Sequence, residues 1–298
     1  MKKMGSLSKW KGLKFTKMHA TGNDFILIDE FNSILIPDEK KPEFVRSVSH
    51  RNFGVGSDGV IFIQSSDKTD VKFLFYNPDG SLAEMCGNGI RCFSKYVYEK
   101  EIVAKKNFEV ETLAGIVAIE IFTRNEKVEK IKVNMGKPKL LRKDIPVSGN
   151  KEETFINRQI EINGKNIRIT AISMGNPHAV IFVEDVAKVD VIELGRKIRH
   201  LKIFPKGVNV HFVQKISEQE FKIRSYERGV ENETLACGSG ICASAVSAYL
   251  NGLTSSQELK FHALGGSLEV ELNLRPEGEV KEVYLIGDAE YIFEGKLL

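Results

Sequence analysis

The sequence contains the same cysteine turn twice, as EMCGNGIRC at residues 84–92 and as LACGSGIC at residues 235–242. In both, a cysteine stands directly before Gly-x-Gly, and a segment with the pattern of a helix follows. Cys86 and Cys237 are 237 − 86 = 151 residues apart. A motif repeated at so large an interval predicts two structural units built on one plan.

Two further pairs of motifs keep almost the same interval. Gly22 in TGNDFILID corresponds to Gly175 in MGNPHAVIFVED, 175 − 22 = 153 residues later. Gly54 in FGVGSDGVIFI corresponds to Gly207 in KGVNVHFVQ, again 207 − 54 = 153 residues later. Each of these glycines precedes an apolar run typical of a strand. Three landmarks in the same order at nearly one offset favour internal duplication over coincidence.

Each half is therefore expected to consist of strands and a hairpin that lead through a turn into one prominent helix. The first helix, GIRCFSKYVYEKE, has Ile90, Phe93 and Val97 at helical spacing. The second, GICASAVSAYLNG, has small residues nearly all round, which indicates burial on most sides. We predict an α+β fold with two pseudo-symmetric halves, each a β-rich, barrel-like sheet wrapped round a central helix.

The predicted organisation has three parts. Residues 1–12 hold few apolar groups and are expected to form a flexible N-terminal extension. The first half is expected over residues 13–136, joined by the C-terminal strands 283–298, and the second half over 137–282. The seam is placed at the Gly and Pro residues of NMGKPKLLRKDIP.

Composition narrows the class of protein without naming a partner. The chain has 298 residues, 42% hydrophobic and 28% charged, as expected for a folded globular protein. Its 43 basic and 40 acidic residues are spread along the sequence, so no nucleic-acid or membrane-binding patch is predicted. Because no secretory signal or membrane-length apolar run is present, we expect a cytoplasmic protein.

The cysteine turns suggest acid/base chemistry. A cysteine at a helix N-terminus is near the positive end of the helix dipole, which favours the thiolate, and the same turn offers amide groups to a carboxylate. If an approximate two-fold axis relates the halves, the two turns can face each other across a cleft. Inversion of a stereocentre needs one group to remove a proton and another to return one from the opposite face. The duplication therefore predicts a racemase or epimerase.

The cysteines also allow other interpretations. Cys92 and Cys242 lie inside the predicted helices and are interpreted as packing residues. Neither half has a Cys-x-x-Cys spacing, so no metal site is predicted. A thiol redox or sensor protein that uses Cys86 and Cys237 reversibly is an alternative of another class.

The motifs KMHATGNDF, YNPDGSLAEMCGNGIRC, MGNPH, GVNV and ERGVENETLACGSG resemble, in order, those of the diaminopimelate epimerases. The resemblance covers nearly the whole chain from about Leu13. It implies a pyridoxal-phosphate-independent enzyme that interconverts LL- and meso-diaminopimelate for lysine and peptidoglycan synthesis. No cofactor is implied, the partner is the small-molecule substrate, and a homodimer is compatible with the family.

The resemblance also implies roles for particular residues. Cys237 would accept a proton and Cys86 would donate one in the LL-to-meso direction, with the roles exchanged in reverse. His178 and Glu227 would support these steps. The implied substrate contacts are Asn23, Asn77, Gly87, Asn88, Asn176, Asn209, Glu227, Arg228, Gly238 and Ser239. Arginine suits the distal carboxylate of such a substrate because its guanidinium can bind a carboxylate through two hydrogen bonds.

Some positions stand apart from this assignment. Gly59 occupies a place where some family members carry a glutamine that touches substrate, so that contact is expected to be absent or replaced. His19 falls in a family motif without an assigned role. The remaining histidines are interpreted as surface or satisfied structural residues: His50, His200, His211 and His262.

The closest rival is a two-cysteine racemase of the proline or hydroxyproline type. Those enzymes tend to have His after the first Cys-Gly and Ser-Pro before the second cysteine, whereas this chain has Asn88 and LAC. The Glu227-Arg228 pair also suits a substrate with a second charged end.

Overall fold

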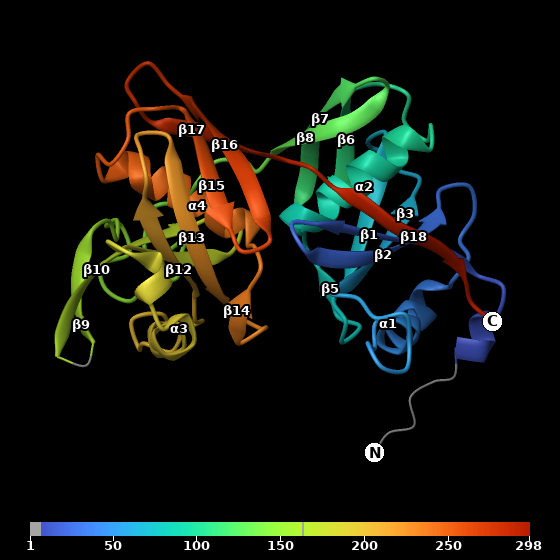
Figure 1. Ribbon diagram of the computed structural model, residues 1–298, viewed down its shortest axis with the longest axis horizontal. Helices are drawn as coiled ribbons and strands as arrows, with labels where there is room; N and C mark the ends of the chain where they lie inside the picture. Colours follow the sequence, from blue (N-terminus) through green and yellow to red (C-terminus); the bar gives the residue numbers. More distant parts are fainter. Residues whose placement is uncertain (1–6, 163) are drawn as a thin grey trace. The chain divides into compact units, whose positions relative to one another are not determined.

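The computed structural model describes residues 7–162 and 164–298, which form two compact units (Figure 1). Unit 1 contains the chain up to Val133 together with Gly287–Leu298, and unit 2 is Asn134–Ile286. Of the predicted extension over residues 1–12, the first six lie outside the described residues. Leu7–Trp10 form a short 3-10 helix, and the Trp10 ring packs edge-on against Phe44 with the ring centres 5.1 Å apart.

Unit 1 is a mixed sheet with two α-helices. Along the chain its elements are β1 (Lys14–Ala20), β2 (Asn23–Glu30), α1 (Lys41–Val48), β3 (Gly59–Gln64), β4 (Val71–Tyr76), β5 (Leu82–Ala83), α2 (Gly87–Glu99), β6 (Asn107–Thr112), β7 (Gly115–Arg124), β8 (Lys127–Asn134) and β18 (Glu290–Lys296). The strands pair in the order β18-β1-β2-β3-β4-β6-β7-β8. The pairs β2–β3 and β4–β6 are parallel, and α1 and α2 lie in the connections that these pairs require.

Unit 2 repeats this arrangement element by element. It contains β9 (Arg158–Ile162), β10 (Lys165–Ser173), β11 (Pro177–Phe182), α3 (Val191–Arg199), β12 (Asn209–Lys215), β13 (Glu220–Glu227), β14 (Asn232–Thr234), α4 (Gly238–Leu250), β15 (Glu258–Ala263), β16 (Gly266–Leu274) and β17 (Val280–Gly287). The order is β9-β10-β11-β12-β13-β15-β16-β17, again with two parallel pairs, β11–β12 and β13–β15. In unit 2 the first strand of the first hairpin, β10, pairs on its outer side with β9. In unit 1 the equivalent strand, β1, pairs with β18.

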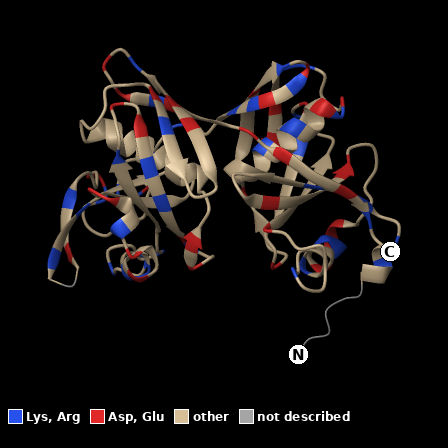
Figure 2. Ribbon diagram, in the orientation of Figure 1, with Lys and Arg blue, Asp and Glu red and all other residues tan. Residues whose placement is uncertain are grey.

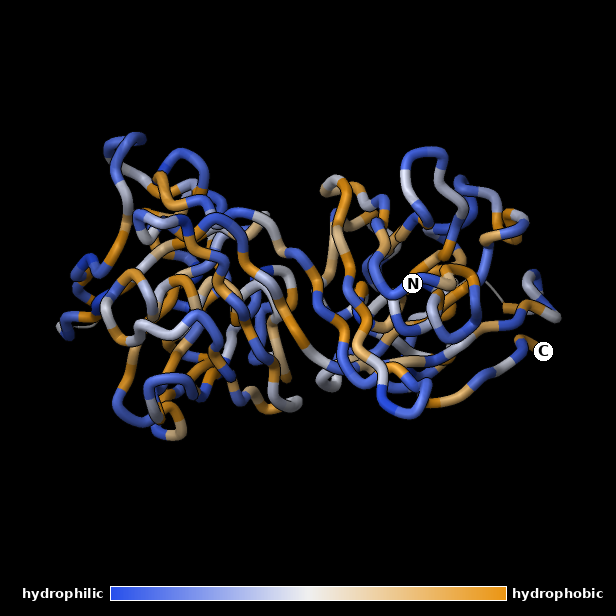
Figure 3. The backbone as a smooth tube through the Cα atoms, turned by 90° about the horizontal axis from the view of Figure 1, so that it is seen from above, coloured by the Kyte–Doolittle hydropathy of each residue, from blue (hydrophilic) through white to orange (hydrophobic). Residues whose placement is uncertain are grey.

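A central helix packs against the strands of each unit. Helix α2 contacts β1, β2, β3, β4 and β7, and α4 contacts β10, β11, β12 and β16. Small side chains such as Ala243, Ala245 and Ala248 leave α4 buried on nearly all sides, as its composition predicts. In Figure 3 the apolar segments of the trace run through the interior of each unit. The predicted fold class is therefore confirmed.

The matched Gly-Asn motifs are tight turns. Gly22 closes the β1–β2 hairpin with φ 81°, and Gly175 closes the β10–β11 hairpin with φ 93°. Both values lie in the left-handed region that glycine adopts without steric cost. Asn23 is the first residue of β2, and Asn176 directly precedes β11. Sequence spacing alone therefore located two equivalent hairpins.

The distribution of charge agrees with the even spread in the sequence. Figure 2 shows basic and acidic residues dispersed over the strands, helices and loops of both units. Among the described residues no helix is long and apolar enough to cross a membrane.

Candidate active site

Each cysteine of the repeated turn is the residue directly before a central helix. Cys86 precedes α2 and Cys237 precedes α4, and both helices have 13 residues. Both cysteines have extended backbones, with φ and ψ of −136° and 120° for Cys86 and −116° and 102° for Cys237. The first amides of a helix have no partner within the helix itself and can bind a negatively charged group. Here the third amide of each helix, that of Gly89 or Gly240, donates to the cysteine sulfur.

Cys86 is held at the surface of unit 1 by polar contacts. The Gly89 amide donates a hydrogen bond to its sulfur at 3.5 Å, and the thiol donates to Asn23 Oδ1 at 3.8 Å. Asn88 donates to the same oxygen at 3.3 Å, while the Asn23 amide donates to Asp58 at 2.7 Å. Three residues that the sequence assigns to the site, Asn23, Cys86 and Asn88, thus lie together.

Arg91, which was not singled out from the sequence, fixes the turn that carries Cys86. Its side chain is fully buried, and the guanidinium donates to the Gly87 carbonyl at 3.0 Å and to Asn88 Oδ1 at 3.1 Å. It also donates to the Asp288 carbonyl at 3.1 Å and to Thr21 Oγ1 at 3.3 Å. The sequence did offer one signal, since Arg91 stands between two apolar residues of the predicted helix. An arginine that is buried at such a place must be well paired, which indicates a structural role.

Cys237 lies in a different environment from Cys86. It is buried, with its sulfur 3.9 Å from Ser239 Oγ. Burial raises the pKa of its thiol well above the usual value, and the negative charge of Glu227 and a hydrogen bond to that carboxylate raise it further. The expectation that the helix terminus favours the thiolate is wrong for Cys237, because loss of water outweighs the helix dipole there.

Two histidines beside this cysteine form a directed chain of hydrogen bonds. His178 Nε2 is 2.8 Å from Asn176 Oδ1, His178 Nδ1 is 2.9 Å from His211 Nε2, and His211 Nδ1 is 2.8 Å from Ser225 Oγ. Burial lowers the pKa of His211 to about 3, and burial and the neighbouring His211 hold the pKa of His178 well below its usual value. Both rings are therefore neutral.

Neutral rings fix every proton in this chain. Because Asn176 Oδ1 can only accept, His178 carries its proton on Nε2 and accepts at Nδ1. His211 then donates from Nε2 and accepts the Ser225 hydroxyl proton at Nδ1. His211 is a satisfied buried residue, in line with its interpretation from the sequence, but its closeness to the cysteine turn was not foreseen.

The remaining predicted contacts in unit 2 come from β12 and β13. Asn209 is buried and donates to the Pro177 carbonyl at 3.1 Å, while its Oδ1 accepts from the Arg228 amide at 2.9 Å. The Arg228 side chain is exposed and donates to the Lys206 carbonyl at 3.2 Å. Asn209 thus positions the backbone from which the guanidinium extends.

Two positions in unit 1 that the sequence analysis relates to substrate contact, Asn77 and Gly59, do not contact the residues around Cys86 in the described hydrogen bonds. Asn77 lies in the turn after β4, and its amide donates to Ser81 Oγ at 3.0 Å rather than to another predicted site residue. A Cβ on Gly59 would lie 2.4 Å from the Phe75 ring and 2.8 Å from the Tyr76 carbonyl oxygen. No side chain fits at Gly59, so a glutamine contact has no room at that place in this chain.

The other two cysteines match their interpretation as packing residues. Cys92 and Cys242 are fully buried within α2 and α4, and all four cysteines are free thiols. Burial raises the pKa of the Cys92 thiol above its usual value.

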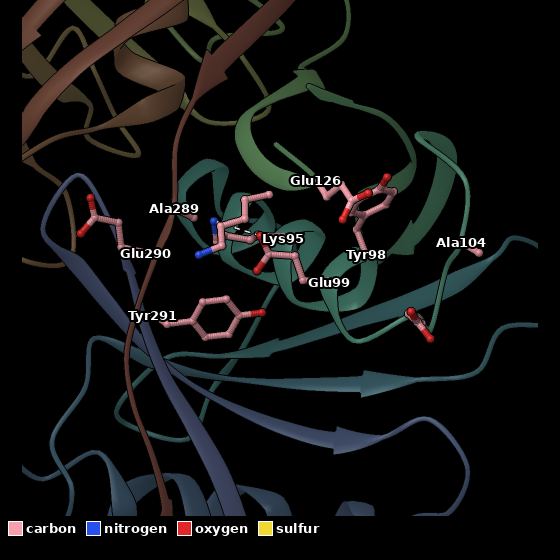
Figure 4. A pocket seen from close by; sticks show the side chains of 10 residues that line it. Lys95, Tyr98, Glu99, Ala104, Glu126, Ala289, Glu290 and Tyr291 are labelled. Carbon is pink, nitrogen blue, oxygen red and sulfur yellow. Dashed lines mark ion pairs between the residues drawn. The ribbon is translucent and has the colours of Figure 1, made fainter. Parts of the chain in front are cut away.

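A surface hollow of about 970 Å³ in unit 1 is lined by residues from the C-terminal part of α2 and the segment after it, from the β7–β8 turn and from the start of β18 (Figure 4). Lys95 and Glu99 form an ion pair of 3.3 Å there, and Tyr291 of β18 lies beside them. None of its lining residues is a cysteine or a predicted substrate contact. The cysteine turns remain the candidate site.

The fold of this chain is similar to that of known enzymes and related proteins of solved structure. The fold is similar to that of a PhzF-family phenazine biosynthesis protein from Bacillus anthracis, with a TM-score of 0.70 at 19% identity over 97% of this chain and 99% of that one. It is also similar to that of a probable proline racemase from Agrobacterium radiobacter K84. The TM-score is 0.68 at 15% identity, and the match covers 96% of this chain and 93% of that one. The protein thus has the same fold class as these two structures.

Sequence comparison then gives the family. The diaminopimelate epimerase family profile matches residues 15–141 and 170–292. A diaminopimelate epimerase from Archaeoglobus fulgidus is 46% identical over 285 residues, which cover 96% of this chain and 96% of that protein. The chain belongs to the diaminopimelate epimerase family.

Proposed function

We propose that this protein interconverts LL- and meso-2,6-diaminopimelate by a two-base mechanism. In the LL-to-meso direction Cys237 accepts the α-proton and Cys86 donates a proton to the opposite face. The observation that carries the proposal is a cysteine directly before each central helix in a chain that matches the family over nearly its whole length. Family membership supports the reaction, and the duplicated turn supports the two bases.

The environment of Cys237 suits a base that is activated in place. In the resting protein the thiol is protonated and hydrogen-bonded to Glu227. Transfer of the thiol proton to this carboxylate leaves a thiolate, which then takes the α-proton of the substrate. Thr234 donates to Glu227 Oε1 at 2.5 Å and keeps the carboxylate oriented.

The helix N-termini are suited to the charge that develops. As the α-carbon loses its proton, negative charge moves onto the neighbouring carboxylate. Amides of Gly87 and Asn88 at α2 and of Gly238 and Ser239 at α4 are preorganised donors for those oxygens. Their hydrogen bonds strengthen as the charge grows, which lowers the barrier.

The distal amino-acid end needs separate recognition. The exposed guanidinium of Arg228 can bind its carboxylate through two parallel hydrogen bonds. Asparagine side chains both donate and accept, so they suit a zwitterion, and the candidates are Asn23, Asn77, Asn176 and Asn209. His178, with its proton fixed on Nε2, supports the orientation of Asn176. We propose that these residues and two thiols suffice without a cofactor.

The proposal is tested by turnover in deuterium oxide. The protein is incubated with LL-diaminopimelate without added pyridoxal phosphate, metal or nucleotide, and the isomers are separated on a chiral column. We expect meso product that carries deuterium at the inverted carbon. Turnover of proline or hydroxyproline but not of diaminopimelate would move the protein to the rival racemases. A reversible thiol oxidation with no turnover of any amino acid would support a redox role.

Single replacements test the two bases. Cys86→Ala and Cys237→Ala should each lower kcat/KM for epimerisation by at least about 100-fold, because a positioned acid or base contributes roughly 10²- to 10⁴-fold. Cys92→Ala and Cys242→Ala are the matched controls, since these thiols are packing residues, and should stay active. Near-normal epimerisation by either of the first two variants would overturn the two-base mechanism.

We propose that the protein acts in the cytoplasm as part of lysine and peptidoglycan precursor synthesis. A homodimer is the oligomeric state that we propose to test, by light scattering during size-exclusion chromatography.

A further inference from the structure

Three soft or borderline donor atoms converge inside unit 2. They belong to His178 on β11, His211 on β12 and Cys237 at the start of α4, and all lie within 4.8 Å of one another. All three residues are buried. Their wide spacing in the sequence hides the cluster, since a metal motif is recognised in a sequence from ligands that are close together.

We propose that His178, His211 and Cys237 form a binding site for one divalent cation of the zinc type, and that the bound ion silences Cys237. Two imidazole nitrogens and a thiolate are preferred ligands of Zn²⁺, and a fourth position would remain for water. The proposed ion replaces the thiol proton of Cys237 and so prevents this residue from acting as a base. The proposed reaction does not require the ion.

The geometry needs only small movements. Zinc bonds of about 2.0 Å to nitrogen and about 2.3 Å to sulfur place tetrahedral donors roughly 3.4–3.6 Å apart. The nitrogens of His178 and His211 are 2.9 Å apart, so they would separate slightly while the sulfur moves inward. Gly240 gives α4 its close approach to this site, since a Cβ there would lie 2.1 Å from the His211 ring.

The protons of the site can rearrange to admit the ion. His178 already has its lone pair on Nδ1. His211 exposes the lone pair of Nε2 when its proton moves to Nδ1, where the Ser225 hydroxyl can rotate to accept it. The Cys237 thiol loses its proton to solvent as the metal–sulfur bond forms, so one proton is released for each ion bound. No oxidant or reductant is needed.

Charges of both signs act near the three donors. Nδ1 of His178 and Nε2 of His211 face each other at 2.9 Å, so both nitrogens can turn a lone pair toward one ion. The positive charge of Arg228 acts on His178 and opposes the ion, whereas the Glu227 carboxylate is hydrogen-bonded to the Cys237 thiol itself and attracts a divalent ion to that place. Among the described residues, Cys86 does not belong to a comparable group of three potential metal ligands.

Metal binding is measured on the intact protein after treatment with a chelator and a reductant. Zn²⁺ is titrated in competition with a chromophoric chelator, and Co²⁺ reports the ligands through its visible and near-ultraviolet absorption. We expect one ion per chain and a sulfur-to-cobalt charge-transfer band. His211→Gln should weaken Zn²⁺ binding at least about ten-fold, because even groups that only orient a metal ligand contribute roughly 10- to 100-fold. His262→Gln, the same change on β15, should bind Zn²⁺ as the unaltered protein does.

A second measurement needs no variant. The unaltered protein is alkylated with iodoacetamide with and without Zn²⁺, and the modified peptides are mapped. We expect Zn²⁺ to protect Cys237 and to leave Cys86 reactive. Equal protection of both cysteines, no charge-transfer band, or unchanged affinity in His211→Gln would each overturn the site.

The effect on catalysis rests on the proposed function, whereas the binding does not. Zn²⁺ should abolish epimerisation, and the chelator should restore it. If Zn²⁺ binds with the expected spectrum and protects Cys237 but epimerisation continues, the site stands and the role of Cys237 as a base fails.

Discussion

Cys86 and Cys237 hold equivalent places in the sequence repeat yet differ as chemical groups. Cys86 is half-buried and shares its hydrogen-bond acceptor with Asn88, whereas Cys237 is buried beside a carboxylate. The helix dipole acts on both, but desolvation differs between them and decides the protonation state of Cys237. Two groups with different environments suit a reaction in which one must begin as base and the other as acid.

Glu227→Gln tests this account of Cys237. Removal of the negative charge should lower the pKa of the thiol, so alkylation of Cys237 should begin at lower pH and speed up about ten-fold for each unit by which the pKa falls. Epimerisation should fall in the same variant, because the acceptor of the thiol proton is gone. The pH dependence of iodoacetamide modification, mapped by peptide, measures the first effect.

The two opposite changes separate this explanation from general damage to the protein. Glu279→Gln, at an exposed position in unit 2, is the control and should change neither quantity. If the onset of Cys237 alkylation in Glu227→Gln moved to higher pH, the electrostatic role of Glu227 would be refuted.

Much of the site could be predicted from residue types and order. The paired cysteines and Gly-Asn turns are local patterns, so repetition was enough to find them. The sequence did not reveal that Arg91 and His211 help to shape the cysteine turns, because their roles depend on burial and on partners far away in the sequence. Arg91 bonds to the carbonyl of Asp288, and His211 bonds to His178. The raised pKa of Cys237 was missed for the same reason: a helix terminus is visible in a sequence, but the exclusion of water from it is not.

At the scale of elements, α2 and α4 share their length and starting motif but pack differently. Gly89 and Gly240 are the third residues of the two helices. A Cβ on Gly89 would come within 3.3 Å of a terminal methyl of Ile61, which can move aside. A Cβ on Gly240 would lie 2.1 Å from the ring of His211, which is held at both nitrogens.

Alanine at these two positions should therefore have unequal effects on stability. Gly240→Ala should lower the free energy of unfolding by about 1–3 kcal/mol or more, because the ring cannot move without breaking its hydrogen bonds. Gly89→Ala should stay within about 1 kcal/mol, since the gain in helix propensity offsets a mild clash. Urea denaturation of both variants beside the unaltered protein provides the comparison. Equal losses would mean that the contact with His211 does not restrict α4.

The helices and hairpins were predictable because their signals are local. The parallel pairs β2–β3 and β11–β12 were not, since parallel partners are joined by long crossovers and meet only through tertiary packing. The sequence analysis expects C-terminal strands to join the first half, but the particular pairing of β18 with β1 depends on tertiary packing between opposite ends of the chain.

At the scale of the whole molecule, the last strand completes the first unit. β18 pairs along β1 in antiparallel register from Lys14↔Lys296 to His19↔Glu290. The rings of Phe15 and Phe293 pack 5.9 Å apart, and Leu297 is buried in the same cluster as Phe15. In unit 2 the corresponding place is filled locally by β9, which pairs with β10. Unit 1 is therefore complete only when β18 has been made.

Deletion of residues 290–298 should accordingly weaken unit 1 and spare unit 2. The deletion makes β1 an edge strand and removes the buried Leu297 side chain, whose burial alone contributes about 1.5–3 kcal/mol. Hydrogen exchange followed by mass spectrometry should show faster exchange in β1 and β2, with protection kept in β10, β11 and β12. Deletion of Leu298 alone is the control, because this residue is 91% exposed and should leave exchange unchanged. If β1 kept its protection in the longer deletion, unit 1 would be stable without β18. If protection fell equally in both units, the two units would unfold together and the expected selective effect would be wrong.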